Sequence, residues 1–297
     1  MLSPTLLGRL DCAAASGLFA DATRLMVVAD DDTRLHVYAR GSLAPLGTVA
    51  LFPDALPSAH RERKAAKPDL EVLTSLGGGR LLALGSGSTP RRRRGALIRL
   101  PAEDVPTAGD VCTLDLAPLY AALDGRFPAL NIEGAALIGG VLHVLQRGNG
   151  TDGQNALVHL DFAAVEAALS GSGVFGADLL LGVTEVALGG LPGGALGFTD
   201  AWALPDGDLL YTAVAEGGGS TYEDGAFGGA VLGRMSPRGE IRWRREMTGG
   251  HKVEGLCGLR TEREGTELNL LLVADADDPS VPAPVLALTL SAASLAG

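Results

Sequence analysis

Five polar residues recur along the chain where short apolar segments begin, and each carries a side-chain oxygen. They are separated by 55, 62, 66 and 55 residues: Ser16, Glu71, Glu133, Thr199 and Glu254. Carboxylates and hydroxyls form an all-oxygen ligand set, which suits a hard cation such as Ca²⁺. Softer metals prefer cysteine or histidine, and neither residue stands at these positions. If the fold brings the five residues together, the sequence predicts a cation site, with Ca²⁺ as the first candidate and Asp200 as a replacement for Thr199.

The three glutamates of this set would repel one another if they met in a narrow space of low dielectric. A bound cation or a proton must then compensate for their charge. In the alternative interpretation, the glutamates accept hydrogen bonds from the amides of neighbouring strands at a solvated channel mouth, and no ion is present.

Each of the five residues opens a repeating unit of short apolar strands joined by tight turns. The step from Glu254 through the C-terminus and back to Ser16 has about the same length as the other steps. A circular repeat must close its period in this way, and a linear one need not. The sequence therefore predicts an all-β, five-bladed β-propeller; a β-sandwich is the alternative.

We expect one domain, residues 1–297, in which residues 4–10 add a strand to the last blade and so close the ring. Two short helical insertions are predicted at residues 116–127 and 162–169 from their apolar spacing. The predicted blades are residues 12–52, 69–117, 131–188, 197–247 and 252–290.

In a propeller, the start of each first strand lies on the same face as the loop between the second and third strands. Basic and polar residues in these loops, or just before a first strand, could bind an anionic small molecule: Arg91, Arg92, Arg93, Arg94, Arg147, Asn149, His251 and Lys252. For any single arginine of the run, a solvated loop is the alternative. Acidic residues on the same face are candidate general bases: Asp30, Glu223 and Asp277.

Composition excludes several classes of function. Lys and Arg number 24 against 35 Asp and Glu, a net charge of −11, which argues against nucleic acid as a partner. No apolar run is long enough to span a membrane, and the first residues lack the apolar core of a signal peptide. The three cysteines are odd in number and widely spaced, which argues against a disulfide framework or a zinc site. We therefore expect a soluble cytoplasmic protein, and the sequence leaves its oligomeric state open.

Several segments carry a resemblance to known families. The chain resembles an uncharacterised bacterial family of predicted propellers through DLEVLTSL, LALGSGSTPRRRRG, LNIEGAAL, LQRGNG, FTDAWALPDG, HKVEGL and VADADDP. This resemblance implies the fold.

A more distant resemblance is to the calcium-activated nucleotidases (apyrases), five-bladed propellers with calcium in the channel. Their one-per-blade ligand set of serine, glutamate, glutamate, serine and glutamate is similar to the five residues above. Residues 197–216 and 251–256 resemble two of their blades. Thr199 replaces a serine, and LQRGNG stands where those proteins have a basic His-Glu-Arg loop. Phytase-like and esterase-like propellers share the Glu-Gly blade starts.

Two functions follow as hypotheses. The first is a calcium-dependent hydrolase of a phosphorylated or other anionic small molecule at the channel mouth. The alternative is a non-catalytic propeller that binds a ligand or a protein, with a structural ion in its central channel.

Overall fold

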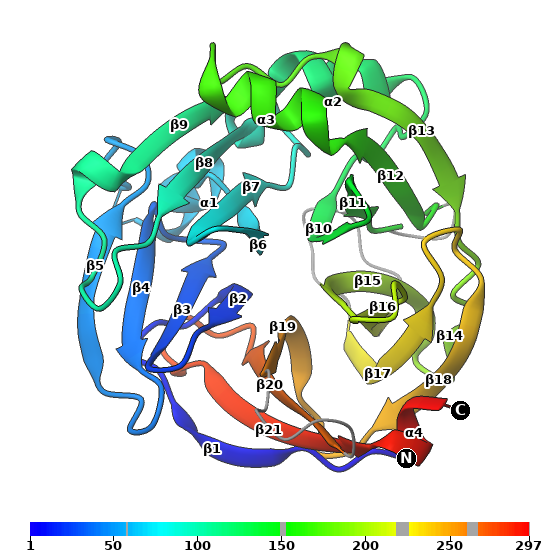
Figure 1. Ribbon diagram of the computed structural model, residues 1–297. Helices are drawn as coiled ribbons and strands as arrows, with labels where there is room; N and C mark the ends of the chain where they lie inside the picture. The colour runs from blue at the N-terminus through cyan, green and yellow to red at the C-terminus, as the bar shows by residue number, and fades with distance from the viewer. Residues whose placement is uncertain (58, 149–152, 218–225, 260–266, 297) are drawn as a thin grey trace.

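Five antiparallel sheets surround a common axis, which confirms the predicted five-bladed β-propeller (Figure 1). The computed structural model describes residues 1–57, 59–148, 153–217, 226–259 and 267–296. Apolar strands of five to ten residues, separated by glycine-rich turns, favour this arrangement because sheets that pack on both faces need apolar side chains on both.

Each blade begins with its innermost strand and ends with its outermost. Blade 1 contains β2 (Ala15–Ala20), β3 (Arg24–Ala29), β4 (Arg34–Ala39) and β5 (Pro45–Ala50). Blade 2 contains β6 (Leu70–Gly77), β7 (Arg80–Gly85), β8 (Arg94–Arg99) and β9 (Val111–Asp115). Blade 3 contains β10 (Ile132–Ile138), β11 (Val141–Gln146), β12 (Ala156–Asp161) and β13 (Leu180–Glu185). Blade 4 contains β15 (Gly194–Ala203), β16 (Leu209–Gly217), β17 (Ala226–Met235) and β18 (Ile241–Met247), with an unpredicted short strand, β14 (Gly190–Leu191), paired to β15.

The last blade is completed by the N-terminus, as predicted. It contains β19 (Lys252–Leu259), β20 (Glu267–Asp275) and β21 (Pro284–Ser291), and β1 (Thr5–Arg9) pairs antiparallel with β21. Because β1 covers the free edge of β21, the first and last parts of the chain share one sheet and the ring is closed.

The core lies between the blades rather than at the centre of the ring. Five clusters of buried apolar side chains each join two neighbouring blades, and together they run around the whole propeller. One of them packs Met26 and Val28 of blade 1 against Leu70 and Leu81 of blade 2. This packing leaves the inner edges of the blades, with the ends of their first strands, free to line the axis.

Helices lie along the outer edges of blades 2 and 3 (Figure 1). The two predicted insertions are confirmed as α2 (Ala117–Asp124), which follows blade 2, and α3 (Phe162–Ser170), between the third and fourth strands of blade 3 (Figure 1). Two further helices, α1 (His60–Ala66) and α4 (Ala292–Ala296), were not predicted, and the 3₁₀ turns are η1 (Pro90–Arg92), η2 (Ala108–Asp110) and η3 (Ala177–Leu179). Among the described residues, no helix has the length and apolar character needed to cross a membrane.

Candidate functional site

The five oxygen-bearing residues predicted from the sequence lie on the five innermost strands, and each stands at a β-bulge. The pairing of the first strand with the second skips Glu71, Glu133, Thr199 and Glu254, and in blade 1 it skips Ser16 together with Gly17. A bulge leaves its extra residue unpaired in the hydrogen-bond ladder between the strands and changes the direction of its side chain. The repeated bulge thus singles out one oxygen-bearing residue in the inner strand of each blade.

The inner strands approach one another closely just after these bulges. A Cβ added at Gly17 would lie 2.5 Å from the amide nitrogen of Leu73 in β6, and one at Gly134 would lie 2.8 Å from the Cα of Asp200 in β15. A Cβ at Gly255 would collide with the carbonyl oxygen of Ser16. Glycine at these three positions lets the backbones of neighbouring blades meet around a narrow axis.

Blade 4 differs from the others in chemistry. The Thr199 hydroxyl donates to Thr212 Oγ1 at 2.9 Å, and both groups are buried. Asp200 accepts hydrogen bonds from the amides of Ala201 and Leu256, each at 2.7 Å. Asp200 therefore uses one oxygen within β15 and the other to join β15 to β19, which argues against Asp200 as the replacement ligand.

Arg147 lies among three carboxylates from three blades. Its guanidinium is 3.6 Å from Glu133 Oε1, 3.8 Å from Glu254 Oε2 and 2.8 Å from Glu216 Oε2. Only 8% of its side chain is exposed, so water screens these ion pairs little. Asn131 also donates a hydrogen bond to Glu133.

Lys252 forms a second cationic centre beside Arg147. Its Nζ lies 3.1 Å from Glu216, 3.4 Å from Glu254 and 2.8 Å from Asp277. Burial alone would lower the pKa of Lys252, but these carboxylates raise it above its ordinary value. Lys252 therefore stays charged and ties the start of β19 to the end of β16 and to the loop after β20.

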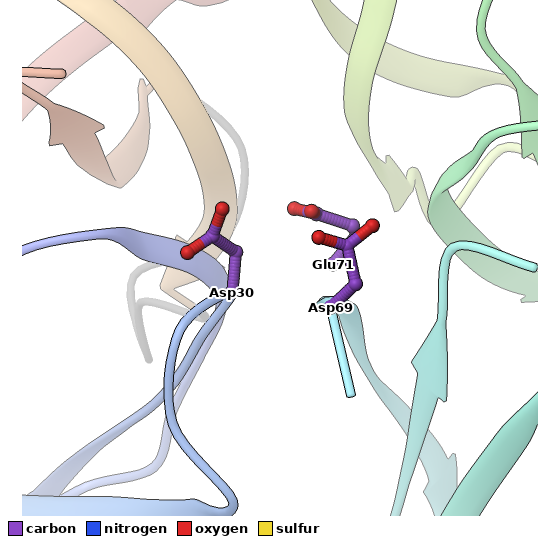
Figure 2. Close-up of side chains that lie close together, drawn as sticks. All are labelled: Asp30, Asp69 and Glu71. Carbon is purple, nitrogen blue, oxygen red and sulfur yellow. The ribbon is translucent and has the colours of Figure 1, made fainter. Parts of the chain in front are cut away.

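A carboxylate cluster lies at the junction of blades 1 and 2, where Asp30 faces Asp69 and Glu71 across a gap (Figure 2). One oxygen of each lies within 4.8 Å of the others. Lys67 Nζ pairs with Asp30 and, at 2.9 Å, with Asp69, while Arg92 Nη1 is 2.7 Å from Asp69. We call Asp30, Asp69 and Glu71 the acidic triad.

Burial makes several of these carboxylates hard to ionise. Desolvation is the largest cause that raises the pKa of Glu133 to about 8, and Arg147 opposes it. Desolvation, followed by the charges of Glu133, Asp69 and Asp30, raises the pKa of Glu71 well above its ordinary value. The pKa of Glu254 is also raised, by desolvation, in spite of Lys252 and Arg147. The mouth therefore contains more carboxylate than its own cations neutralise.

The arginine run does not converge on the channel as a unit. Arg92 reaches Asp69 at the mouth, but Arg93 pairs with Asp124 of α2 at 2.6 Å, and Arg94 stacks on Phe52 and pairs with Asp54. The chain passes through the 3₁₀ turn η1 before β8 begins at Arg94, so the four adjacent side chains leave the backbone in different directions. Arg91 is exposed in η1, and His251 directly precedes β19. Asn149 and Glu223 lie outside the described residues.

Sequence reasoning missed Asp69, the member of the acidic triad with the most ion-pair partners. Asp69 has a φ of 56°, a left-handed conformation that aspartate tolerates better than most residues. The available signal was its position two residues before Glu71, at the entry to the strand.

Several solved structures align with nearly the whole chain. The chain is 11% identical to a glutaminyl cyclase from Myxococcus xanthus, over 98% of both chains, with a TM-score of 0.52. It is 11% identical to a PQQ-bound aldose sugar dehydrogenase from Streptomyces coelicolor, over 98% of this chain and 99% of that one, with a TM-score of 0.47. A tail fibre of a Staphylococcus aureus phage, also 11% identical with a TM-score of 0.48, aligns over 97% of this chain, which spans 52% of the fibre's length. No curated protein matches the chain.

The family comparison confirms the resemblance to an uncharacterised family. The matching model covers nearly all of the propeller, residues 11–290, from the segment before β2 to near the end of β21. The chain belongs to the family of unknown function DUF6929.

Proposed function

We propose that the channel mouth binds a hard divalent cation, with Ca²⁺ as the first candidate, and that the protein hydrolyses a phosphorylated or other anionic small molecule there. The observation that carries the proposal is the acidic triad, whose oxygens lie within 4.8 Å of one another. Carboxylate oxygens at this separation can share one cation of the size of Ca²⁺.

Two further observations support the fit. Glu254 Oε2 is buried and has no hydrogen-bond partner among the described residues. Carboxylates of the mouth outnumber Lys67, Arg92, Arg147 and Lys252, the cations that contact them. Buried carboxylates without a full set of partners are costly, and a cation lowers that cost.

In this proposal the acidic triad would hold the ion, together with the neighbouring Glu133 and Glu254. A bound Ca²⁺ would supply a Lewis acid for the oxygens of the substrate. Arg147 and Lys252 would neutralise the anionic group of the substrate, since both lie beside Glu254. Asp277 is the better candidate for a general base than Asp30, because a third of its side chain is exposed and water can reach it.

Thermal unfolding with CaCl₂ or with EGTA tests the ion. We expect Ca²⁺ to raise the melting temperature of the wild-type protein, because it binds only the folded state. At a Ca²⁺ concentration of 100 Kd, binding adds about 2.7 kcal/mol to the free energy of unfolding. Glu71→Gln should abolish the effect, and the exposed Glu103→Gln should keep it. A wild-type protein that responds to neither CaCl₂ nor EGTA would refute the cation site.

A specific observation favours the non-catalytic alternative. Arg147 and Lys252 are already paired with buried carboxylates, so an anionic substrate would have to compete with these carboxylates for them.

A panel of phosphatase, nucleotidase and esterase substrates distinguishes the two functions. Turnover that requires Ca²⁺ and falls at least about 100-fold in Asp277→Asn supports the hydrolase. Stabilisation by Ca²⁺ without turnover supports a structural ion.

A further inference from the structure

A large cavity lies at the end of the channel opposite the carboxylates. Its volume is about 760 Å³, and residues from the far ends of all five inner strands line it, among them Phe19 of β2, Leu73 of β6, Leu137 of β10, Trp202 of β15 and Leu259 of β19. None of the carboxylates described at the mouth is part of its wall. Small-molecule sites commonly have volumes of about 300–1,000 Å³.

The wall of this cavity combines apolar and polar surface, and its apolar part includes two aromatic side chains. Phe19, Leu137 and Trp202 are only half-buried, whereas most other large apolar side chains of the described residues are buried. The indole of Trp202 rests against Gly258, where an added Cβ would lie 2.5 Å from Trp202 Cζ2. This close packing holds the ring in one position on the wall, as a binding surface for an apolar body requires.

The cavity also contains a guanidinium without a carboxylate partner. Arg24 pairs with Asp21 at 2.7 Å, and Arg80 pairs with Glu166 at 2.7 Å. Arg40, from the same wall, donates to the backbone carbonyl of Asp21 at 2.8 Å and forms no ion pair with any carboxylate of the described residues. A half-buried cation beside an apolar surface attracts an anion more strongly than one in open water.

We propose that this cavity binds a small amphipathic anion, with an aromatic or branched apolar body against Phe19 and Trp202 and a single anionic group on Arg40. The apolar part of the wall would supply most of the affinity for the ligand, and the guanidinium would fix its orientation, as in most small-molecule sites. The site needs no metal, and it uses the opposite ends of the strands that carry the bulges.

The probe for the experiment is 8-anilinonaphthalene-1-sulfonate, which combines an aromatic body with one sulfonate. We expect saturable binding to the wild-type protein in EGTA, with energy transfer from tryptophan. The chain has two tryptophans, and Trp243 lies on the outer strand β18, where its Nε1 donates to Leu295. Trp202→Phe should therefore remove most of the transfer and change the affinity by less than about threefold, since phenylalanine keeps an aromatic surface.

Two variants test the charge and the volume. Arg40→Gln should weaken binding of the sulfonate about tenfold, the effect of losing one hydrogen bond to a charged group. It should leave the affinity for the uncharged N-phenyl-1-naphthylamine unchanged. Arg238→Gln, an exposed arginine outside the cavity, is the matched control. Ala203→Trp, on the cavity wall, should block both probes.

The proposal is wrong if the wild-type protein binds neither probe saturably, or if Arg40→Gln binds the sulfonate as well as Arg238→Gln does. Circular dichroism and thermal unfolding establish that each variant is folded. If Ala203→Trp does not fold, the comparison of Arg40→Gln with the two probes still decides the outcome, because Arg40 is outside the apolar core clusters.

Discussion

Glycine next to a bulge decides how closely two blades can approach. Gly255 follows Glu254, and its backbone packs on the carbonyl oxygen of Ser16 in the neighbouring blade. The same relation holds between Gly134 and Asp200. Glu133 and Glu254 therefore lie beside close backbone contacts between blades, and their positions depend on residues without a side chain.

We predict that Gly255→Ala lowers the free energy of unfolding by about 1–3 kcal/mol, because the new methyl group overpacks the contact with Ser16. Chemical denaturation measures the change. Gly41→Ala is the control, because an added Cβ there would meet no heavy atom within 4 Å. Equal stability of the two variants would contradict the close approach.

A pair of histidines on blade 3 predicts a dependence of stability on pH. His143 and His159 face each other across β11 and β12, with their Nδ1 atoms 2.9 Å apart. Burial, followed by the charge of His159, lowers the pKa of His143 from 6.5 to about 4. Between these values the unfolded chain binds a proton that the folded protein does not, so stability is present above pH 6.5 and is lost as the pH falls toward 4.

His143→Gln should remove this loss. Compared with the variant, the wild-type protein should lose about 2 kcal/mol of unfolding free energy between pH 7 and pH 5. Urea unfolding at the two pH values measures the difference. Parallel pH profiles for the two proteins would show that the histidine pair has an ordinary pKa.

At the scale of elements, ring closure depends on one short strand. β1 pairs with β21, and the next residue, Leu10, is buried, with its amide bonded to the carbonyl of Ala283. Without β1 the edge of β21 would be exposed and the cluster that joins blade 5 to blade 1 would lose Leu10.

Removal of residues 1–10 should therefore lower the free energy of unfolding by at least about 3 kcal/mol, from the exposed leucine and the lost ladder hydrogen bonds. A synthetic peptide of residues 1–12 should restore part of this stability by adding the strand back. A scrambled peptide is the control. If the truncated protein were as stable as the full chain, β1 would not be what closes the ring.

At the scale of the whole molecule, the channel has two ends of different chemistry. One end is rich in buried carboxylates and cations, and the other is a cavity with Phe19, Trp202 and Arg40 on its wall. The two sets of residues share the inner strands but no ion pair among the described residues.

The two ends should therefore act independently, since effects at separated sites without shared partners add. We expect Arg40→Gln to keep the full stabilisation by Ca²⁺, and Glu71→Gln to bind 8-anilinonaphthalene-1-sulfonate with wild-type affinity. Titrations of each variant with both ligands measure the coupling. A shift of more than about threefold in the affinity of the distant site would show that the ends communicate.

The repeat, the ring and its closure by residues 4–10 could be read from the sequence, because period and strand length are local properties that a closed ring must satisfy. The five oxygen-bearing residues could be found for the same reason, since each occupies the same place in its repeat. The directions of the side chains in the arginine run 91–94 could not be predicted in this way. Arg93 and Arg94 pair with Asp124 and Asp54, which are distant in the chain.

The sequence by itself determined the architecture and the oxygen-bearing residue of each inner strand. Only the tertiary structure decided which charges meet, such as Asp69 with Asp30 and Glu71, and that Asp200 accepts a hydrogen bond from the backbone of β19. It also decided that a cavity of about 760 Å³ lies at the other end of the channel. The physical reason is that periodicity is a property of the sequence alone, whereas ion pairs and cavities depend on side-chain directions that packing between blades sets.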